Sequence, residues 1–60
     1  MPELQGDITY SIDSDETIFS ANTPAGEKFL EGPERAIATN EAIEFLEAAR
    51  AAGLTVVPFP

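Results

Sequence analysis

The stretch that decides the fold is Asp7-Ile-Thr-Tyr-Ser-Ile-Asp-Ser-Asp-Glu-Thr-Ile-Phe-Ser-Ala-Asn22. From Asp7 to Ile12 apolar and polar residues alternate, which is the period of a half-buried strand with one solvated face. A second β-rich run covers Thr17–Asn22, and the polar residues Asp13–Glu16 between the two runs tolerate turn geometry. Two strands joined by four residues predict an antiparallel hairpin.

The segment after the hairpin carries start and stop signals for a short helix. Thr23 followed by Pro24 is a typical N-cap with proline at the first helical position, and Gly32-Pro33 prevents continuation. A turn into a third strand at Glu27–Leu30 is the alternative. We favour the helix, because it explains the signals at both ends of the segment.

The second half of the chain predicts a strand, a long helix and a final strand. Residues 34–38 are expected to be extended. A helix capped by Thr39 or Asn40 then runs to about Ala52, since most of its residues favour helix, and Gly53 supplies a left-handed ending. Leu54–Val57 is expected to form the last strand.

These elements predict an α+β fold in the order β-β-α-(β)-α-β. The expected architecture is a small twisted sheet with the long helix packed on one face. If 35–38 pairs in parallel with 54–57, the connection 39–53 is long enough for a helical crossover, which should be right-handed. Residues 1–60 form one small domain, with 1–6 as a flexible N-terminus and 58–60 as a C-terminal tail. The predicted core consists of Ile8, Tyr10, Ile12, Ile18, Phe29, Leu30, Ile37, Ile43, Phe45, Leu46, Ala49, Leu54 and Val56.

Composition excludes several classes of protein. The chain has 60 residues and contains neither cysteine nor histidine, so disulfides and the usual zinc, haem or iron–sulfur ligands are missing, and no cofactor is expected. A domain of this size has a thin stability margin, which predicts either good packing or a homodimer. We expect a cytoplasmic protein, because the start lacks the pattern of a signal peptide and no long apolar run spans a membrane.

Charge indicates the kind of partner. Eleven acidic residues against three basic ones give a formal net charge of −8, which repels nucleic-acid phosphates and anionic lipids and attracts basic proteins. Glu41, Glu44 and Glu47 form an acidic row on the long helix. Solubility and adaptation to a saline cytoplasm are alternative explanations of the same charge, and a solvated helix face is the alternative explanation of the row.

The letters Asp13-Ser-Asp-Glu-Thr17 have the D-x-D-x-T spacing that resembles the haloacid-dehalogenase-like phosphohydrolases, in which the first Asp attacks phosphate and the second acts as acid and base. The resemblance covers five residues. That chemistry also needs a lysine, further acids for Mg²⁺ and a larger doubly wound sheet. A calcium loop starting at Asp13 would need Gly and Glu where Ile18 and Pro24 stand. At most, Asp13, Asp15 and Glu16 form a weak, nonspecific cation site.

The sequence therefore predicts a non-catalytic, acidic protein-interaction module that binds a protein partner or a second copy of itself. The alternative is an acidic inhibitor or nucleic-acid mimic that occupies a basic site on a DNA- or RNA-handling protein. Phe19, Val57 and Phe59 are expected to form an apolar patch on the sheet face away from the helix. The predicted interaction surface consists of Glu41, Glu44, Glu47, Phe19, Val57 and Phe59.

Overall fold

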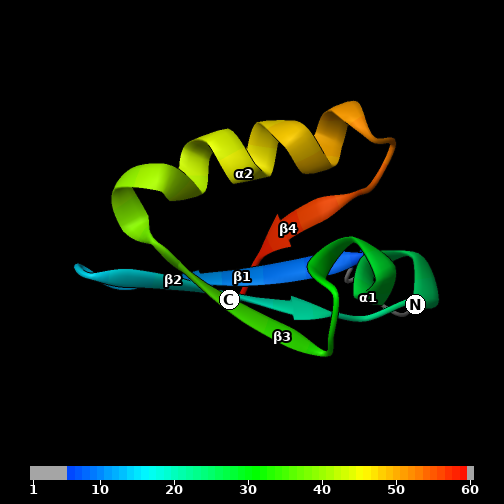
Figure 1. The fold of residues 1–60 in the computed structure, drawn as a ribbon, viewed down its shortest axis with the longest axis horizontal. Coiled ribbons are helices and arrows are strands. Elements are labelled where there is room, and N and C mark those ends of the chain that lie inside the picture. Colours follow the sequence, from blue (N-terminus) through cyan, green and yellow to red (C-terminus); the bar gives the residue numbers. More distant parts are fainter. Residues whose placement is uncertain (1–5, 60) are drawn as a thin grey trace.

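The computed structural model describes residues 6–59, which form two helices and one four-stranded sheet (Figure 1). In chain order the elements are β1 (Ile8–Ile12), β2 (Glu16–Ala21), α1 (Pro24–Leu30), β3 (Glu34–Ala38), α2 (Thr39–Ala51) and β4 (Val56–Pro58). The sheet order is β3-β2-β1-β4, with β4 parallel to β1 and the other neighbours antiparallel. The predicted α+β class, element order and hairpin are confirmed.

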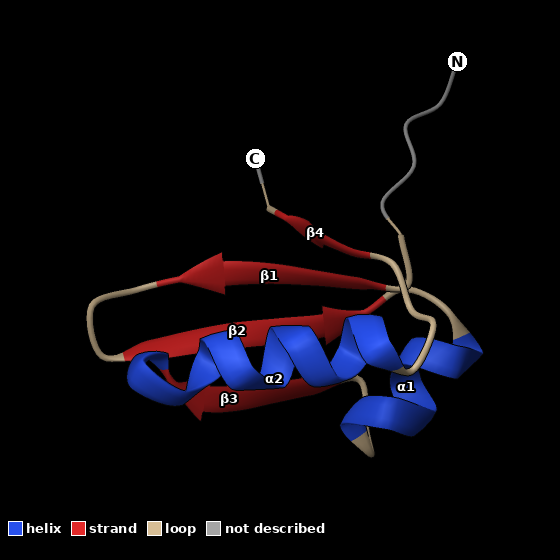
Figure 2. Cartoon of the chain, turned by 90° about the horizontal axis from the view of Figure 1, so that it is seen from above, coloured by secondary structure: helices blue, strands red, loops and turns tan. Residues whose placement is uncertain are grey.

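Helix α2 lies across one face of the sheet and carries the chain from the β3 edge to the β4 edge (Figure 1, Figure 2). The predicted pairing of 35–38 with 54–57 is wrong, because β2 and β1 lie between these segments. β4 pairs with β1 instead, where the Asp7 N–H donates to the Thr55 carbonyl at 2.8 Å. This pairing places Val56 opposite Ile8 and buries both side chains.

The register of the hairpin determines which side chains reach the core. Tyr10 lies opposite Phe19, and residues directly opposite each other in an antiparallel pair share a face. Phe19 is therefore on the helix-covered face and only 1% exposed, whereas Ile18 lies on the other face and is half-buried. The prediction that Ile18 is inside and Phe19 outside is wrong, because the turn between β1 and β2 sets Ile12 opposite Thr17 and so places Thr17 and Phe19 on the same face as Ile12.

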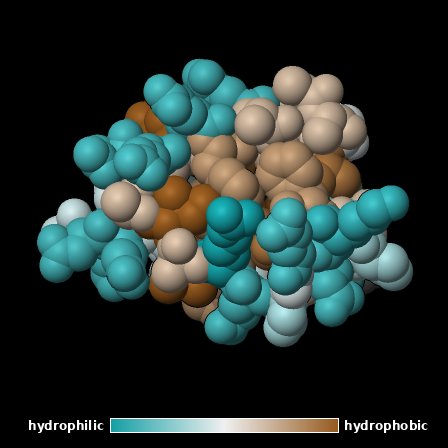
Figure 3. All heavy atoms as spheres, viewed as in Figure 1, coloured by the Kyte–Doolittle hydropathy of each residue, from teal (hydrophilic) through white to brown (hydrophobic). Residues whose placement is uncertain are grey.

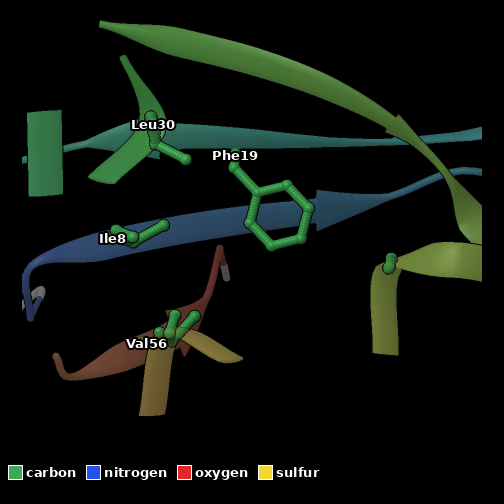
Figure 4. Close-up of a cluster of buried hydrophobic side chains, with 6 residues drawn as sticks. Ile8, Phe19, Leu30 and Val56 are labelled. Carbon is green, nitrogen blue, oxygen red and sulfur yellow. The ribbon is translucent and has the colours of Figure 1, made fainter. Parts of the chain in front are cut away.

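The core lies between the sheet and the two helices. Figure 4 shows Ile8, Phe19, Leu30 and Val56 converging from β1, β2, α1 and β4. Ala42 and Ala49 are buried on the side of α2 that faces the sheet, and Phe45 packs against Phe19 and Phe29 with tilted rings whose centroids are 4.8 and 5.2 Å away. The fully buried apolar residues are Ile8, Phe19, Leu30, Ala42, Ala49 and Val56.

Two predicted core residues are exposed. Ile12 is 59% exposed at the end of β1, and Ile43 is 65% exposed on α2. The buried stripe of α2 runs through Ala42 and Ala49, which lie seven positions apart and therefore on one face, and it leaves Ile43 at its solvent side. The other predicted members are buried or half-buried.

Helix α1 forms as predicted, and the alternative third strand at Glu27–Leu30 is wrong. The Thr23 side chain accepts from the Gly26 N–H at 3.1 Å, and Pro24 occupies the first turn. The left-handed residue that ends the helix is Glu31 (φ 64°), one position before the glycine expected to stop it. Its N–H reaches the carbonyls of Glu27 and Lys28.

The boundaries of the last elements differ from prediction by one or two residues. Ala38, not Thr39 or Asn40, occupies the N-cap position of α2, without a side-chain cap. Gly53 adopts the expected positive φ (91°) after the helix. β4 begins at Val56 and includes Pro58, so the segment predicted as a tail starts inside the sheet. Of the predicted flexible N-terminus 1–6, residues 1–5 lie outside the described part of the chain, as does residue 60, whereas Gly6 is half-buried beside Thr55.

Candidate functional site

The loop with the D-x-D-x-T letters holds the start of α2 through its backbone. The Thr39 hydroxyl donates to the Asp13 carbonyl at 2.8 Å, and the Thr39 N–H donates to the Asp15 carbonyl at 3.1 Å. The buried Thr17 hydroxyl lies 3.1 Å from the Thr39 hydroxyl; because that proton is used on Asp13, Thr17 donates. This motif therefore has a structural role. The hydrogen bonds that join Thr17, Thr39 and Asp13, called the threonine clasp below, attach the hairpin to α2.

The carboxylates of this loop do not converge. Among residues 6–59, no three His, Cys, Asp or Glu side chains lie close enough together to hold one metal ion. Asp13, Asp15 and Glu16 are all exposed. The carbonyls of Asp13 and Asp15 accept from Thr39, and the carbonyl of Glu16 accepts from the Asp13 N–H at 2.9 Å, so all three are used within the protein.

Asp7 has a structural role, and its hydrogen bonds lower the pKa of its carboxyl group. Its carboxylate accepts from the Thr55 N–H at 3.0 Å and from the Thr23 hydroxyl at 2.8 Å. These two hydrogen bonds, that from the backbone of Thr55 first, lower the pKa of Asp7 below its ordinary value. One side chain thus joins the start of β1, the cap of α1 and the approach to β4.

The predicted interaction residues do not form one surface. Phe19 lies in the core, which removes it from any docking patch. Val57 is half-buried and Phe59 is 66% exposed, both at the β4 edge. The acidic row on α2 is exposed throughout, but only Glu41 and Glu44 face the neighbouring strand β3; Glu47 does not line the groove there.

A groove of about 690 Å³ lies between β3 and α2. Ile37 and Phe45 line it and are both half-buried, while Glu41 and Glu44 stand on its helical side. The Arg35 guanidinium lies 5.8 Å from the centre of the Phe45 ring. Figure 3 shows apolar side chains exposed between hydrophilic ones on this side of the molecule. The lining of the groove is mostly polar: it combines two carboxylates and one guanidinium with a smaller apolar part supplied by Ile37 and Phe45.

The groove is bordered by a strand edge with unused hydrogen-bonding groups. The bonds from Ala21 N–H to the Pro33 carbonyl and from Thr39 N–H to the Asp15 carbonyl mark hydrogen-bonded pairs of the β2–β3 ladder. Such pairs alternate with pairs whose backbone groups point outward. Glu34, Ala36 and Ala38 are therefore the β3 residues whose N–H groups face away from β2, and all three are exposed.

The two edges of the sheet are not equivalent. β4 is three residues long and ends in Pro58, which has no N–H to offer. β3 has five residues, no proline, and an uncharged stretch Ala36–Ala38 behind the charged pair Glu34 and Arg35. Figure 2 shows β3 as the outermost strand, with α1 near its first residues only. β3 is the edge that remains available for pairing.

No helix within residues 6–59 has the length and apolar character needed to cross a membrane. The chain matches no protein-family model, no curated protein and no solved structure. Its function is therefore inferred from its own surface.

Sequence reasoning missed most of this site. It identified Glu41 and Glu44, and it placed Ile37 and Phe45 in the core, against which both pack, but it did not show that both also line a groove. It also considered an internal pairing for 35–38. One signal in the sequence bears on the sheet edges. Proline is found in edge strands, where its missing N–H removes no hydrogen bond, so Pro58 indicates an edge that cannot extend the ladder there. The segment 34–38 contains no proline and keeps all its N–H groups.

Proposed function

We propose that this chain is a non-catalytic protein-interaction module that holds a basic protein partner in the groove between β3 and α2. The observation that carries the proposal is a mostly polar groove in which the exposed carboxylates of Glu41 and Glu44 stand beside the partly exposed apolar side chains of Ile37 and Phe45. Exposed apolar surface rimmed by charge is typical of docking sites. A cytoplasmic location, in keeping with the absence of cysteine, is part of the proposal.

The electrostatics favour a basic partner over a second copy. With eleven acids and three bases, at least eight carboxylates have no basic side chain to pair with one-to-one. Two copies would each bring a formal charge of −8 to their contact, whereas a basic segment meets complementary charge. Self-association remains an outcome that dilution experiments would reveal.

The non-catalytic part of the proposal rests on side-chain chemistry. The chain has no cysteine or histidine nucleophile or base, and the serines have no partner base in the described structure that would activate them. Thr17 and Thr39, the hydroxyls with hydrogen bonds in the motif region, are used to attach α2. A binding role is the function these residues support.

Charge reversal at the groove, set against an equal reversal elsewhere, tests the proposal. Glu41→Lys with Glu44→Lys adds two charges per exchange, so the formal net charge rises from −8 to −4. Asp13→Lys with Asp15→Lys makes the same change at the hairpin loop. Immobilised wild type is expected to capture a basic protein from the host lysate, the loop variant to retain it, and the groove variant to lose it.

Two outcomes would contradict the proposal. Equal loss with both variants, together with a steep decline between low and high salt, would favour the acidic mimic, whose binding depends on overall charge. Undiminished capture by the groove variant would place the site elsewhere. Circular dichroism must first show that the groove variant folds, since Glu41 also stabilises the first turn of α2 by about 0.3–1 kcal/mol.

A further inference from the structure

We infer that β3 is a strand-addition site, at which an extended segment of the basic partner pairs with the free edge and lays alternate basic side chains into the groove. The inference rests on the proposed function and specifies how the partner is held. It joins two separate observations, the outward backbone groups of β3 and the groove on the same side of the strand.

The outer edge of β3 offers backbone hydrogen-bonding groups to an added strand. The N–H groups of Ala36 and Ala38 and the carbonyl of Ala36 point away from β2, while the carbonyl of Ala38 begins the hydrogen bonding of α2. Their side chains are methyl groups on the sheet face opposite α2, so they leave room for a neighbouring strand. An added strand would satisfy these groups without displacing any bond of the existing sheet.

Side chains of the added strand alternate between the two faces of the sheet. Those on the helix-covered face would lie beside Ile37 and Phe45 and reach toward Glu41 and Glu44. Long basic residues fit this position best, because their aliphatic stems cover apolar surface while the charged ends meet carboxylates. Those on the other face lie beside Ala36 and Ala38, where β-branched residues pack well.

Arg35 limits where along β3 a basic side chain of the partner can bind. It lies on the groove face near the start of β3, with its guanidinium over Phe45, whereas Glu41 lies just beyond the other end of the strand. A basic side chain is therefore attracted near Ala38 and repelled near Arg35. Arg35→Gln, which keeps a polar side chain of similar length, should tighten binding of a uniformly basic strand.

The probe is a capped peptide of about seven residues in which arginine and valine alternate, long enough to span β3. Three peptides serve as controls: one with the same composition but all arginines before the valines, one with glutamate in place of arginine, and one methylated on the backbone nitrogens that would face β3. Binding is followed by the amide shifts of the isotope-labelled full chain.

The alternating peptide is expected to bind saturably and to shift the amides of 34–38, Glu41 and Phe45. The N-methylated peptide should bind at least about fivefold more weakly, the loss that about one hydrogen bond makes in affinity. The block-ordered peptide keeps its backbone N–H groups but places arginines on both faces, so it should also bind more weakly, by about threefold or more. The glutamate peptide should not bind. Glu41→Lys with Glu44→Lys should weaken the alternating peptide by about threefold to tenfold.

A variant of the protein tests whether the Ala36 N–H donates a hydrogen bond to the added strand. Ala36→Pro removes an outward N–H that takes no part in the β2 ladder, a place where proline is tolerated in an edge strand. It should weaken the alternating peptide about fivefold or more, while Ala36→Thr, which keeps the N–H, should not. If Ala36→Pro does not fold, the N-methylated peptide tests the same backbone hydrogen bonding with the wild-type protein.

The possible failures are distinguishable. Equal binding of alternating, block-ordered and N-methylated peptides, still weakened by the Glu41 and Glu44 reversals, would overturn strand addition and leave the basic-partner proposal standing. Absence of binding by every basic peptide at low salt would overturn both. Amide shifts at 34–38 on simple dilution of the chain would show that a second copy occupies the edge and would also overturn the inference.

Discussion

One glycine outside the candidate groove, Gly26, determines how closely α1 packs on the sheet. Gly26 is buried in α1, and a Cβ placed there would collide with the backbone carbonyl of Asp7. The same carbonyl accepts the Asn22 N–H at 2.9 Å, so it cannot move away freely. The weak helix propensity of glycine is visible in the sequence, but its cause, the close approach of α1 to the start of β1, is a tertiary contact.

Replacing Gly26 by alanine should therefore destabilise the protein, although alanine is the better helix former. We expect a loss of about 1–3 kcal/mol in the free energy of unfolding, the usual effect of overpacking. Ala25→Ser, on the exposed side of the same helix, should change it by less than about 0.5 kcal/mol. Urea unfolding measures both, and a neutral or stabilising Gly26→Ala would disprove the close approach.

The threonine clasp gives a second prediction at this scale. Thr39→Val removes the bond to the Asp13 carbonyl and leaves the buried Thr17 hydroxyl without its partner, which should cost about 2 kcal/mol. Thr17→Val removes one bond and should cost about 1 kcal/mol. The double variant should lose less than the sum, since no buried hydroxyl is then left unpaired. Strict additivity of the three unfolding energies would contradict the clasp.

At the scale of elements, the alternation in β1, the cap at the start of α1 and the glycine after α2 were readable from sequence, but the pairing of the later strands was not. The hairpin and both helices follow from local signals: the polar connection Asp13–Glu16, the Thr23-Pro24 start and the Gly53 ending. The neighbours of β3 and β4 depend on which pairing buries more apolar surface, and that is decided only when all elements are assembled. The edge position of β3, and with it the candidate site, could not be predicted for this reason.

The carboxylate of Asp7 links three elements and makes their association depend on pH. Its pKa is lowered by folding, so its contribution to stability is complete above the ordinary value of 3.8 and is lost as pH falls through the folded-state value below it. Asp7→Asn should be less stable than wild type at neutral pH, and the difference should shrink in this acid range. Thermal unfolding at several pH values would measure it; a difference that grows on acidification would contradict the linkage.

For the whole molecule, charge dominates solution behaviour. Eight excess negative charges on a chain with a radius of gyration of 10.6 Å repel one another, and dissolved salt screens that repulsion. The melting temperature should therefore rise between about 20 mM and about 500 mM NaCl. Both charge-reversal pairs, at the groove and at the hairpin loop, should show a weaker rise. A melting temperature that falls with salt would mean that attractive pairs outweigh the repulsion.

The measurement that tests the central claim most directly is amide hydrogen exchange along β3, with and without the alternating arginine–valine peptide. Outward amides of Ala36 and Ala38 should exchange quickly in the free protein, while those of Arg35 and Ile37, bonded to β2, should be protected. Saturating peptide should slow Ala36 and Ala38 markedly and leave Arg35 and Ile37 protected. Protection of Ala36 and Ala38 in the free monomer, or no change when peptide is bound, would contradict the account.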